Sequence, residues 1–178
     1  MRWPNAWVWL LLVAGCDAGS SAAATDDPTS ARASQFRSSA VTEAIDAASE
    51  VVQTRGFAGR DDEVRGFLVE HAVEARETPM RSGTCYVAIA AASAAMRELD
   101  LRIYDSDGVE VASDTDDGPR AGLRFCPTQT GTYYLTARAT AGSGLYQLRT
   151  FRGPTGLEIR TDDLFRDVPA SEAAREPR

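Results

Sequence analysis

Apolar residues follow a helical spacing early in the chain. Across residues 39–55 they recur at intervals of three and four, a serine is available as the N-cap, and Gly56 follows as a stop. The spacing predicts one short α-helix with a narrow apolar stripe, which either packs on one side or end of a sheet or binds a partner. The stripe consists of Val41, Ile45, Ala48 and Val52.

After Asp62 the pattern changes to short runs separated by turn residues. Leucine and isoleucine alternate with polar residues between positions 99 and 104, and Gly108 supplies the turn of a hairpin after Asp105. Eight short antiparallel strands of this kind predict a mainly β sandwich or barrel. The expected strands are 63–68, 70–78, 84–92, 99–104, 109–112, 123–126, 132–139 and 145–151.

Two stretches of this region carry a family resemblance. The runs LDLRIYDSDGVEVASDTDDG and GTYYLTARATAGSGLYQLRTF resemble the bacterial pre-peptidase C-terminal domain over about residues 65–151. The resemblance implies an antiparallel β-sandwich with a jelly-roll-like layout, found in exported proteins and appended to secreted proteases. Nothing upstream in this chain is long enough to be a protease. The fold we expect is therefore a jelly-roll-like sandwich of about eight strands, preceded by one short α-helix.

The N-terminus has the features of an export signal. Arg2 precedes an apolar stretch, residues 6–14, which is too short to span a bilayer and ends in the sequence VAGC. This sequence resembles the lipobox of bacterial lipoproteins, which implies cleavage before Cys16 and acylation of its thiol. The alternative is an ordinary secretory peptide or a buried apolar strand. Asp17 leaves the choice between inner and outer membrane open.

These patterns divide the chain into five segments. Residues 1–15 are the predicted lipoprotein signal peptide, 16–35 a flexible Ser/Ala/Asp-rich tether and 36–58 a helical segment. Residues 59–151 form the predicted sandwich, and 152–178 a partly disordered tail. In that tail, the apolar residues at 157–159 and 164–165 either dock on the body or form a short linear motif.

Two cysteines remain once Cys16 is acylated. Cys85 opens one predicted strand and Cys126 closes another, and spare thiols of exported proteins are usually oxidised. We therefore predict a structural Cys85–Cys126 disulfide, worth roughly 3 to 4 kcal/mol for a loop of this length. A reactive or metal-binding thiol is the alternative, although no further CxxC spacing or neighbouring histidine supports it.

Charge and motif content exclude several functions. The 178 residues suffice for one domain, and 19 basic against 26 acidic residues, with a net charge of -7, argue against nucleic acid as a partner. The chain has a single histidine, His71, and no HExxH, GxSxG or phosphate-loop pattern. His71 is predicted to be a surface or edge residue of a strand. We expect no enzymatic activity.

Five aspartates crowd two successive loops. Carboxylate oxygens are ligands of calcium, but the spacing is not that of an EF-hand, and aspartate is a common turn residue. Turn formation is the favoured interpretation and calcium the alternative, and no other cofactor is expected. The residues are Asp105, Asp107, Asp114, Asp116 and Asp117.

Two functional classes agree with these features. In the first, the protein is a non-catalytic envelope lipoprotein, held on the lipid bilayer through acylated Cys16, whose sandwich binds a protein or a glycan in the periplasm or at the cell surface. In the second, it is an accessory or structural subunit of a larger envelope or secretion assembly, and its helix and tail make the contacts.

Overall fold

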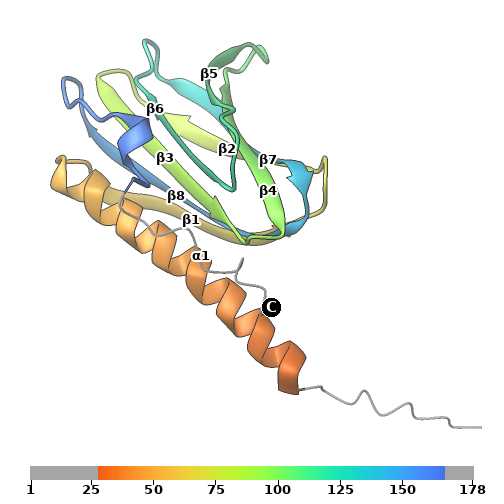
Figure 1. Ribbon diagram of the computed structural model, residues 1–178. Coiled ribbons are helices and arrows are strands. Elements are labelled where there is room, and N and C mark those ends of the chain that lie inside the picture. Colours follow the sequence, from red (N-terminus) through yellow and green to blue (C-terminus); the bar gives the residue numbers. More distant parts are fainter. Residues whose placement is uncertain (1–27, 167–178) are drawn as a thin grey trace, which may run out of the picture.

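The protein is a mainly β sandwich with one long helix packed on it (Figure 1). The computed structural model describes residues 28–166, including the side chains of all of these except 28–38 and 60–61. The elements are α1 (Pro28–Thr54), β1 (Ala58–Leu68), β2 (Val73–Met80), β3 (Thr84–Ala92), β4 (Met96–Tyr104), β5 (Glu110–Asp114), β6 (Arg120–Phe125), β7 (Gly131–Gly142), β8 (Gly144–Pro154) and the 3-10 turn η1 (Thr161–Asp163).

The strands form two four-stranded antiparallel sheets. One has the order β1-β8-β3-β6 and the other the order β2-β7-β4-β5. The pairs are nested, because β4 pairs with β5, β3 with β6, β2 with β7 and β1 with β8. This is the wrapping of a jelly roll, in which a long antiparallel ribbon folds over into two facing sheets. The predicted fold class is confirmed.

One hydrophobic core fills the space between the two sheets. Leu99, Leu101 and Ile103 of β4 are at most 1% exposed and face Leu123 and Leu148 across the sandwich. The alternation found in the sequence of β4 therefore points its apolar set into this core, as expected for a strand with a side-chain period of two.

A second core lies between α1 and the outer face of the β1-β8-β3-β6 sheet. Ile45, Ala48 and Val52 of the helix are completely buried there against Val87 and Ile89 of β3. Strand β3 is thus covered on both faces, which explains its nearly continuous apolar sequence. Of the two interpretations of the helical stripe, packing on the sheet is confirmed.

A polar network also joins α1 to the sheet. Arg149 of β8 is 4% exposed, and its Nη1 donates to Asp46 Oδ1 at 2.6 Å and to Ser49 Oγ at 3.0 Å, both on the helix. Its Nε donates to Glu63 Oε2 of β1 at 3.0 Å. Gln147 donates to the other oxygen of Glu63 at 3.1 Å. One buried guanidinium therefore connects three elements and sets the position of the helix on the sheet.

Glu63 makes this helix contact dependent on pH. Burial raises the pKa of Glu63, but the charge of Arg149 and the hydrogen bonds from Arg65 and Arg149 lower it below its ordinary value. A carboxyl whose pKa is lower in the folded state stabilises the fold fully above its unfolded pKa, about 4.3, and loses this effect as the pH falls through the folded pKa. We expect Glu63→Gln to flatten the loss of stability on acidification below about pH 5.

Urea denaturation at a series of pH values tests this expectation. Glu77→Gln is the matched control, since Glu77 is an exposed residue of β2 and the same charge is removed far from Arg149. The control should lose stability on acidification as the wild type does. A Glu63→Gln variant that loses stability as steeply as the wild type would show that this carboxylate contributes nothing.

Several boundaries differ from the sequence predictions, most clearly those of the helix, β1 and β2. The helix begins at Pro28 rather than residue 39, so residues 28–35 of the predicted tether are helical. Proline is favoured in the first helical turn, and the alanines and arginines that follow are strong helix formers. Because this segment has no apolar stripe, its helical conformation was not predicted. Strand β1 also begins earlier, at Ala58. Strand β2 begins later, at Val73, so His71 lies in a turn and not in a strand.

The tail docks on the body as far as the structure describes it. Leu164 is 1% exposed in the second core, and Leu157, Ile159 and Phe165 pack partly buried around it. The guanidinium of Arg120 lies over the ring of Phe165, 5.8 Å from its centroid. Docking of these apolar residues is therefore confirmed, and a freely exposed motif at 164–165 is wrong. The predicted disorder of the last residues lies outside the described part.

The two ends of the sandwich differ in their relation to the helix. Turns 81–83, 105–109 and 126–130 lie at one end, which we call the distal end. The end of α1 points towards it, because Phe57, which follows the helix, packs on Gly153 near the end of β8. Val41 and Thr42, further towards the start of the helix, lie beside Leu145 and turns 69–72 and 93–95, which we call the proximal end. Figure 1 shows the first turns of α1 extending past the proximal end, at the lower right. No helix of the described residues is long and apolar enough to cross a membrane.

Candidate functional site

Cys85 and Cys126 form a disulfide at the distal end. Their Cα atoms are 4.1 Å apart, well below the separation of about 7 Å beyond which no bridge can form. Cys85 is completely buried near the start of β3, and Cys126 directly follows β6, so the bridge joins two neighbouring strands of the sheet beneath α1. The predicted pairing is present. Arg124 Nη2 lies 3.5 Å from Cys85 Sγ, beside the bridge.

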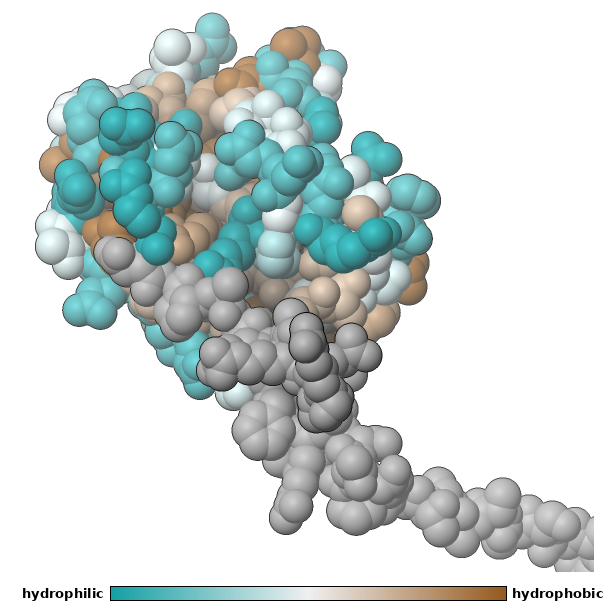
Figure 2. All heavy atoms as spheres, viewed as in Figure 1, coloured by the Kyte–Doolittle hydropathy of each residue, from teal (hydrophilic) through white to brown (hydrophobic). Residues whose placement is uncertain are grey.

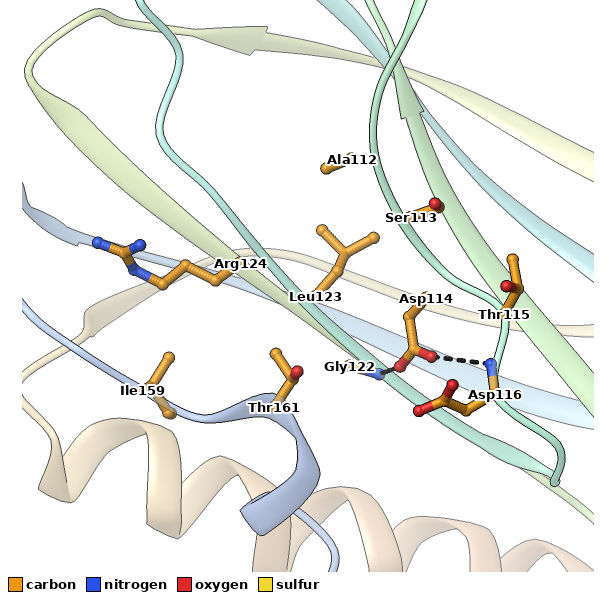
Figure 3. A pocket seen from close by; sticks show the side chains of 10 residues that line it. All are labelled: Ala112, Ser113, Asp114, Thr115, Asp116, Gly122, Leu123, Arg124, Ile159 and Thr161. Carbon is orange, nitrogen blue, oxygen red and sulfur yellow. Dashed lines mark hydrogen bonds between the residues drawn. The ribbon is translucent and has the colours of Figure 1, made fainter.

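One of several surface clefts lies along the β5–β6 edge (Figure 3), where the two sheets meet. This edge cleft has a volume of about 430 Å³ and is closed on one side by Ile159 and Thr161 of the tail. Asp114 lies at its base, where Oδ1 accepts from the Asp116 amide at 3.1 Å and Oδ2 from the Gly122 amide at 2.6 Å. Because Gly122 belongs to the other sheet, the Asp114 carboxylate joins the two sheets at their edges.

The loop cleft lies at the distal end and has a volume of about 340 Å³. It is bounded by the turn after β4 and by residues 128–133. Asp105 shapes this turn, because its Oδ1 accepts from the amides of Asp107, at 3.0 Å, and Val109, at 2.9 Å. Such bonds are the turn chemistry for which aspartate is selected.

The β1–β2 cleft is larger than both of these, with a volume of about 690 Å³, and it also lies at the distal end. It opens between the beginning of β1 and the end of β2. Thr130, Gly131 and Thr132 line both this cleft and the loop cleft. One short segment at the start of β7 therefore separates two hollows on the same end of the molecule.

The five aspartates proposed as calcium ligands are distributed over different places. Asp105 and Asp107 line the loop cleft, Asp114 and Asp116 line the edge cleft, and Asp117 lines neither. Among the described residues no group of three or more histidine, cysteine or acidic side chains is close enough to hold a metal ion. For Asp105 and Asp114, the backbone hydrogen bonds account for the position of the carboxylates.

The other predicted site residues lie elsewhere. His71 is exposed in the proximal turn between β1 and β2, with a φ of 67°, and its amide donates to the Ala139 carbonyl at 2.7 Å. Its prediction as a strand residue is wrong because this left-handed conformation reverses the chain. The predicted lipidation site, Cys16, lies outside the described residues.

Figure 2 shows the surface in the same view, with the distal end at the top. Hydrophilic side chains cover most of this face, and hydrophobic ones gather at the top, over the β4–β5 hairpin. Val109 and Val111 of this hairpin are 58% and 37% exposed. At the opposite, proximal end, Phe67, Val69 and Val73 are exposed. The distal end thus offers two clefts and a small apolar surface.

Comparison with known proteins yields distant similarities. No protein-family model matches the chain, and no curated protein is similar to it in sequence. Among solved structures, the periplasmic inhibitor of g-type lysozyme PliG from Aeromonas hydrophila is similar, with a TM-score of 0.43 and 9% identity over 56% of this chain and 90% of that chain. The pre-peptidase C-terminal domain of a collagenase from Bacillus anthracis is similar with a TM-score of 0.42 and 17% identity over 52% of this chain and 90% of that chain. The second is a domain of the type that the sequence resembles.

Proposed function

We propose that the protein is a non-catalytic binding module of the bacterial cell envelope, anchored to the inner or outer membrane through acylated Cys16. Its distal end holds a protein or glycan partner in the periplasm or at the cell surface. The proposal involves no catalytic group and no cofactor. An accessory role in a larger envelope or secretion assembly is the alternative.

The position of α1 carries this proposal. The helix covers the outer face of one sheet, and its first thirteen residues, 28–40, extend about 20 Å at 1.5 Å per residue. Eleven further positions, 17–27, separate them from Cys16, and a chain of this length spans at most about 40 Å. An anchor at Cys16 is therefore attached on the proximal side. The distal end, with two of the clefts, is turned away from the attachment.

The burial of the helix bears on the alternative role. In an assembly subunit, α1 and the tail would make the contacts with neighbouring proteins. The apolar stripe of α1 and the side chain of Leu164 are already buried against the protein's own sheet. The apolar surface of these two elements is thus occupied in the described residues, which favours the distal end as the place of binding.

Anchoring is tested by Cys16→Ser. We expect this variant to keep residues 1–15, to carry no acyl chains by intact mass, and to leave the detergent phase in phase partitioning, because acyl chains are the membrane attachment. A Cys85→Ala/Cys126→Ala variant, in which Cys16 is intact, should partition like the wild type. Unchanged mass and partitioning of Cys16→Ser would disprove the lipoprotein assignment.

Binding at the distal end is tested by site-specific photocrosslinking in the native envelope. A benzophenone amino acid replaces Gln129, which lies exposed in the turn between β6 and β7, or Ala94, which lies exposed at the proximal end. We expect a discrete adduct from position 129 and none from position 94. Equal labelling at both positions, or no adduct at position 129, would contradict the proposed use of the distal end.

A further inference from the structure

The interior of the sandwich becomes polar at the β1–β2 cleft. On β8, Tyr146 and Leu148 point into the core between the sheets, and the next residue on the same face is Thr150. On β1, Val64 points into this core, and Asp62 precedes it on the same face. The apolar filling therefore stops before the distal end at this corner, and the cleft of about 690 Å³ remains. This volume is typical of small-molecule sites, about 300 to 1,000 Å³.

Thr150 marks the inner wall of the cleft. The residue is 4% exposed, and its Oγ1 has no hydrogen-bond partner among the described residues. A buried hydroxyl without a partner destabilises the folded protein, because it has lost its hydrogen bonds to water. Such a group is retained at a cost in stability, and a ligand that supplies the missing hydrogen bond recovers that cost.

The lining of the cleft fits an uncharged ligand rich in hydroxyl groups. Two acidic residues, Asp62 and Glu77, are balanced by two basic ones, Arg81 and Arg152, so the cleft has no net charge that would attract an ion. The Asp62 carboxylate already lies 2.9 Å from Arg76. Hydroxyl groups, which both donate and accept, form most of the remaining polar lining. They belong to Thr78, Thr84, Thr130, Thr132 and Thr150.

A protein partner fits the same lining less well. Hot spots of protein interfaces are apolar or aromatic anchors that fill pockets. The apolar residues of this cleft include Met80 and Tyr86, which are 2% and 8% exposed and belong to the core. The Tyr86 hydroxyl accepts from the Arg81 amide at 3.0 Å, which fixes the ring in the floor of the cleft. The apolar lining that Met80 and Tyr86 provide is therefore a fixed part of the packed core.

We propose that the β1–β2 cleft binds a neutral oligosaccharide segment and that the Thr150 hydroxyl hydrogen-bonds to it. This deepens the proposed function, on which it rests, by naming the ligand class and the cleft. The site lies at the distal end, where a glycan of the envelope reaches it without passing the helix or its anchor.

The test uses the full chain, purified in detergent, on an array of neutral, anionic and cationic oligosaccharides, with affinities then measured by calorimetry. We expect retention on neutral oligosaccharides and about tenfold weaker binding by Thr150→Val, the effect of one lost hydrogen bond. Thr140→Val is the matched control, because Thr140 Oγ1 is also buried without a partner but does not line the cleft. Both variants remove an unsatisfied hydroxyl, so both should melt at or above the temperature of the wild type.

Three outcomes would overturn the proposal. The first is retention of the protein only on charged oligosaccharides, and the second is retention on none. The third is equal affinity of Thr150→Val and the wild type, as expected if the Thr150 hydroxyl bonds only to water. Crosslinking at position 129 distinguishes these failures from a failure of the proposed function. A protein adduct there, together with an empty array, would reject the glycan and keep the binding module.

Discussion

Replacing Arg149 with methionine is expected to lower the free energy of unfolding by about 2 to 4 kcal/mol. Methionine preserves much of the side-chain volume but leaves Glu63, whose side chain is 22% exposed, without its main counter-charge. Removing one partner of a buried ion pair typically costs 3 to 5 kcal/mol. The range expected here is lower because Asp46, with a side chain 60% exposed, can be hydrated once the guanidinium is gone. Urea denaturation monitored by circular dichroism measures the change.

Two further variants identify the source of this loss. Arg138→Met is the control, since Arg138 is an exposed residue of β7, and its replacement should change stability by less than about 0.5 kcal/mol. Combining Arg149→Met with Glu63→Gln should cost less than the sum of the single variants, because the second change removes the carboxylate that has lost its main counter-charge. Strict additivity would show that the two side chains do not interact and that the loss arises from packing alone.

The pattern of apolar residues and turns was sufficient to predict all eight strands, and the family resemblance favoured a sandwich over a barrel. Strand β3 was predicted at its observed bounds, because turn residues flank its apolar run on both sides. The start of the helix could not be predicted in this way. Its first eleven residues, 28–38, have no apolar stripe, so their helical conformation depends on intrinsic propensity and on continuity with the packed turns that follow.

The polar residues of β8 show why the candidate site was harder to predict. The segment LYQLRTF has polar residues on both faces of an extended strand, Gln147 and Arg149 on one and Thr150 on the other. Arg149 is explained by the helix that covers it, and Thr150 by the cleft between the sheets. Both contacts join residues distant in the sequence, for example Arg149 with Asp46 and Ser49, so the sequence alone could not assign them.

The aspartate-rich loops show that residues close together in the sequence can have separate roles in the structure. A cluster in the sequence suggested a shared ligand. In the structure, however, Asp105 and Asp107 lie before strand β5, whereas Asp114 is the last residue of this strand. Asp105 instead organises a hairpin turn, and Asp114 connects the edge strands of the two sheets. The sequence therefore located turns correctly, while the hydrogen bonds that aspartate makes there depend on the approach of β6.

Loss of the Cys85–Cys126 disulfide is expected to lower the free energy of unfolding by about 2 to 5 kcal/mol, with a drop of roughly 10 °C in the melting temperature. The bridge closes a loop of 41 positions that contains most of β3 and all of β4, β5 and β6, so it restricts the unfolded chain over a long segment. It also holds the end of β6, an edge strand, against β3. We expect the Cys85→Ala/Cys126→Ala variant to fold, because two cores remain, and to melt cooperatively at the lower temperature.

Reduction of the disulfide in the wild type should cause the same loss of stability. This experiment distinguishes the effect of the bridge from the effects of replacing the two side chains. Alanine at position 85 removes a sulfur from a completely buried site, and this alone destabilises by leaving a small cavity. Reductant should therefore lower the melting temperature of the wild type and leave that of the double alanine variant unchanged. If oligosaccharide binding is also measured on both proteins below their melting temperatures, equal affinities identify the bridge as structural. A variant that melts like the wild type but no longer binds would instead assign the cysteines to the binding site.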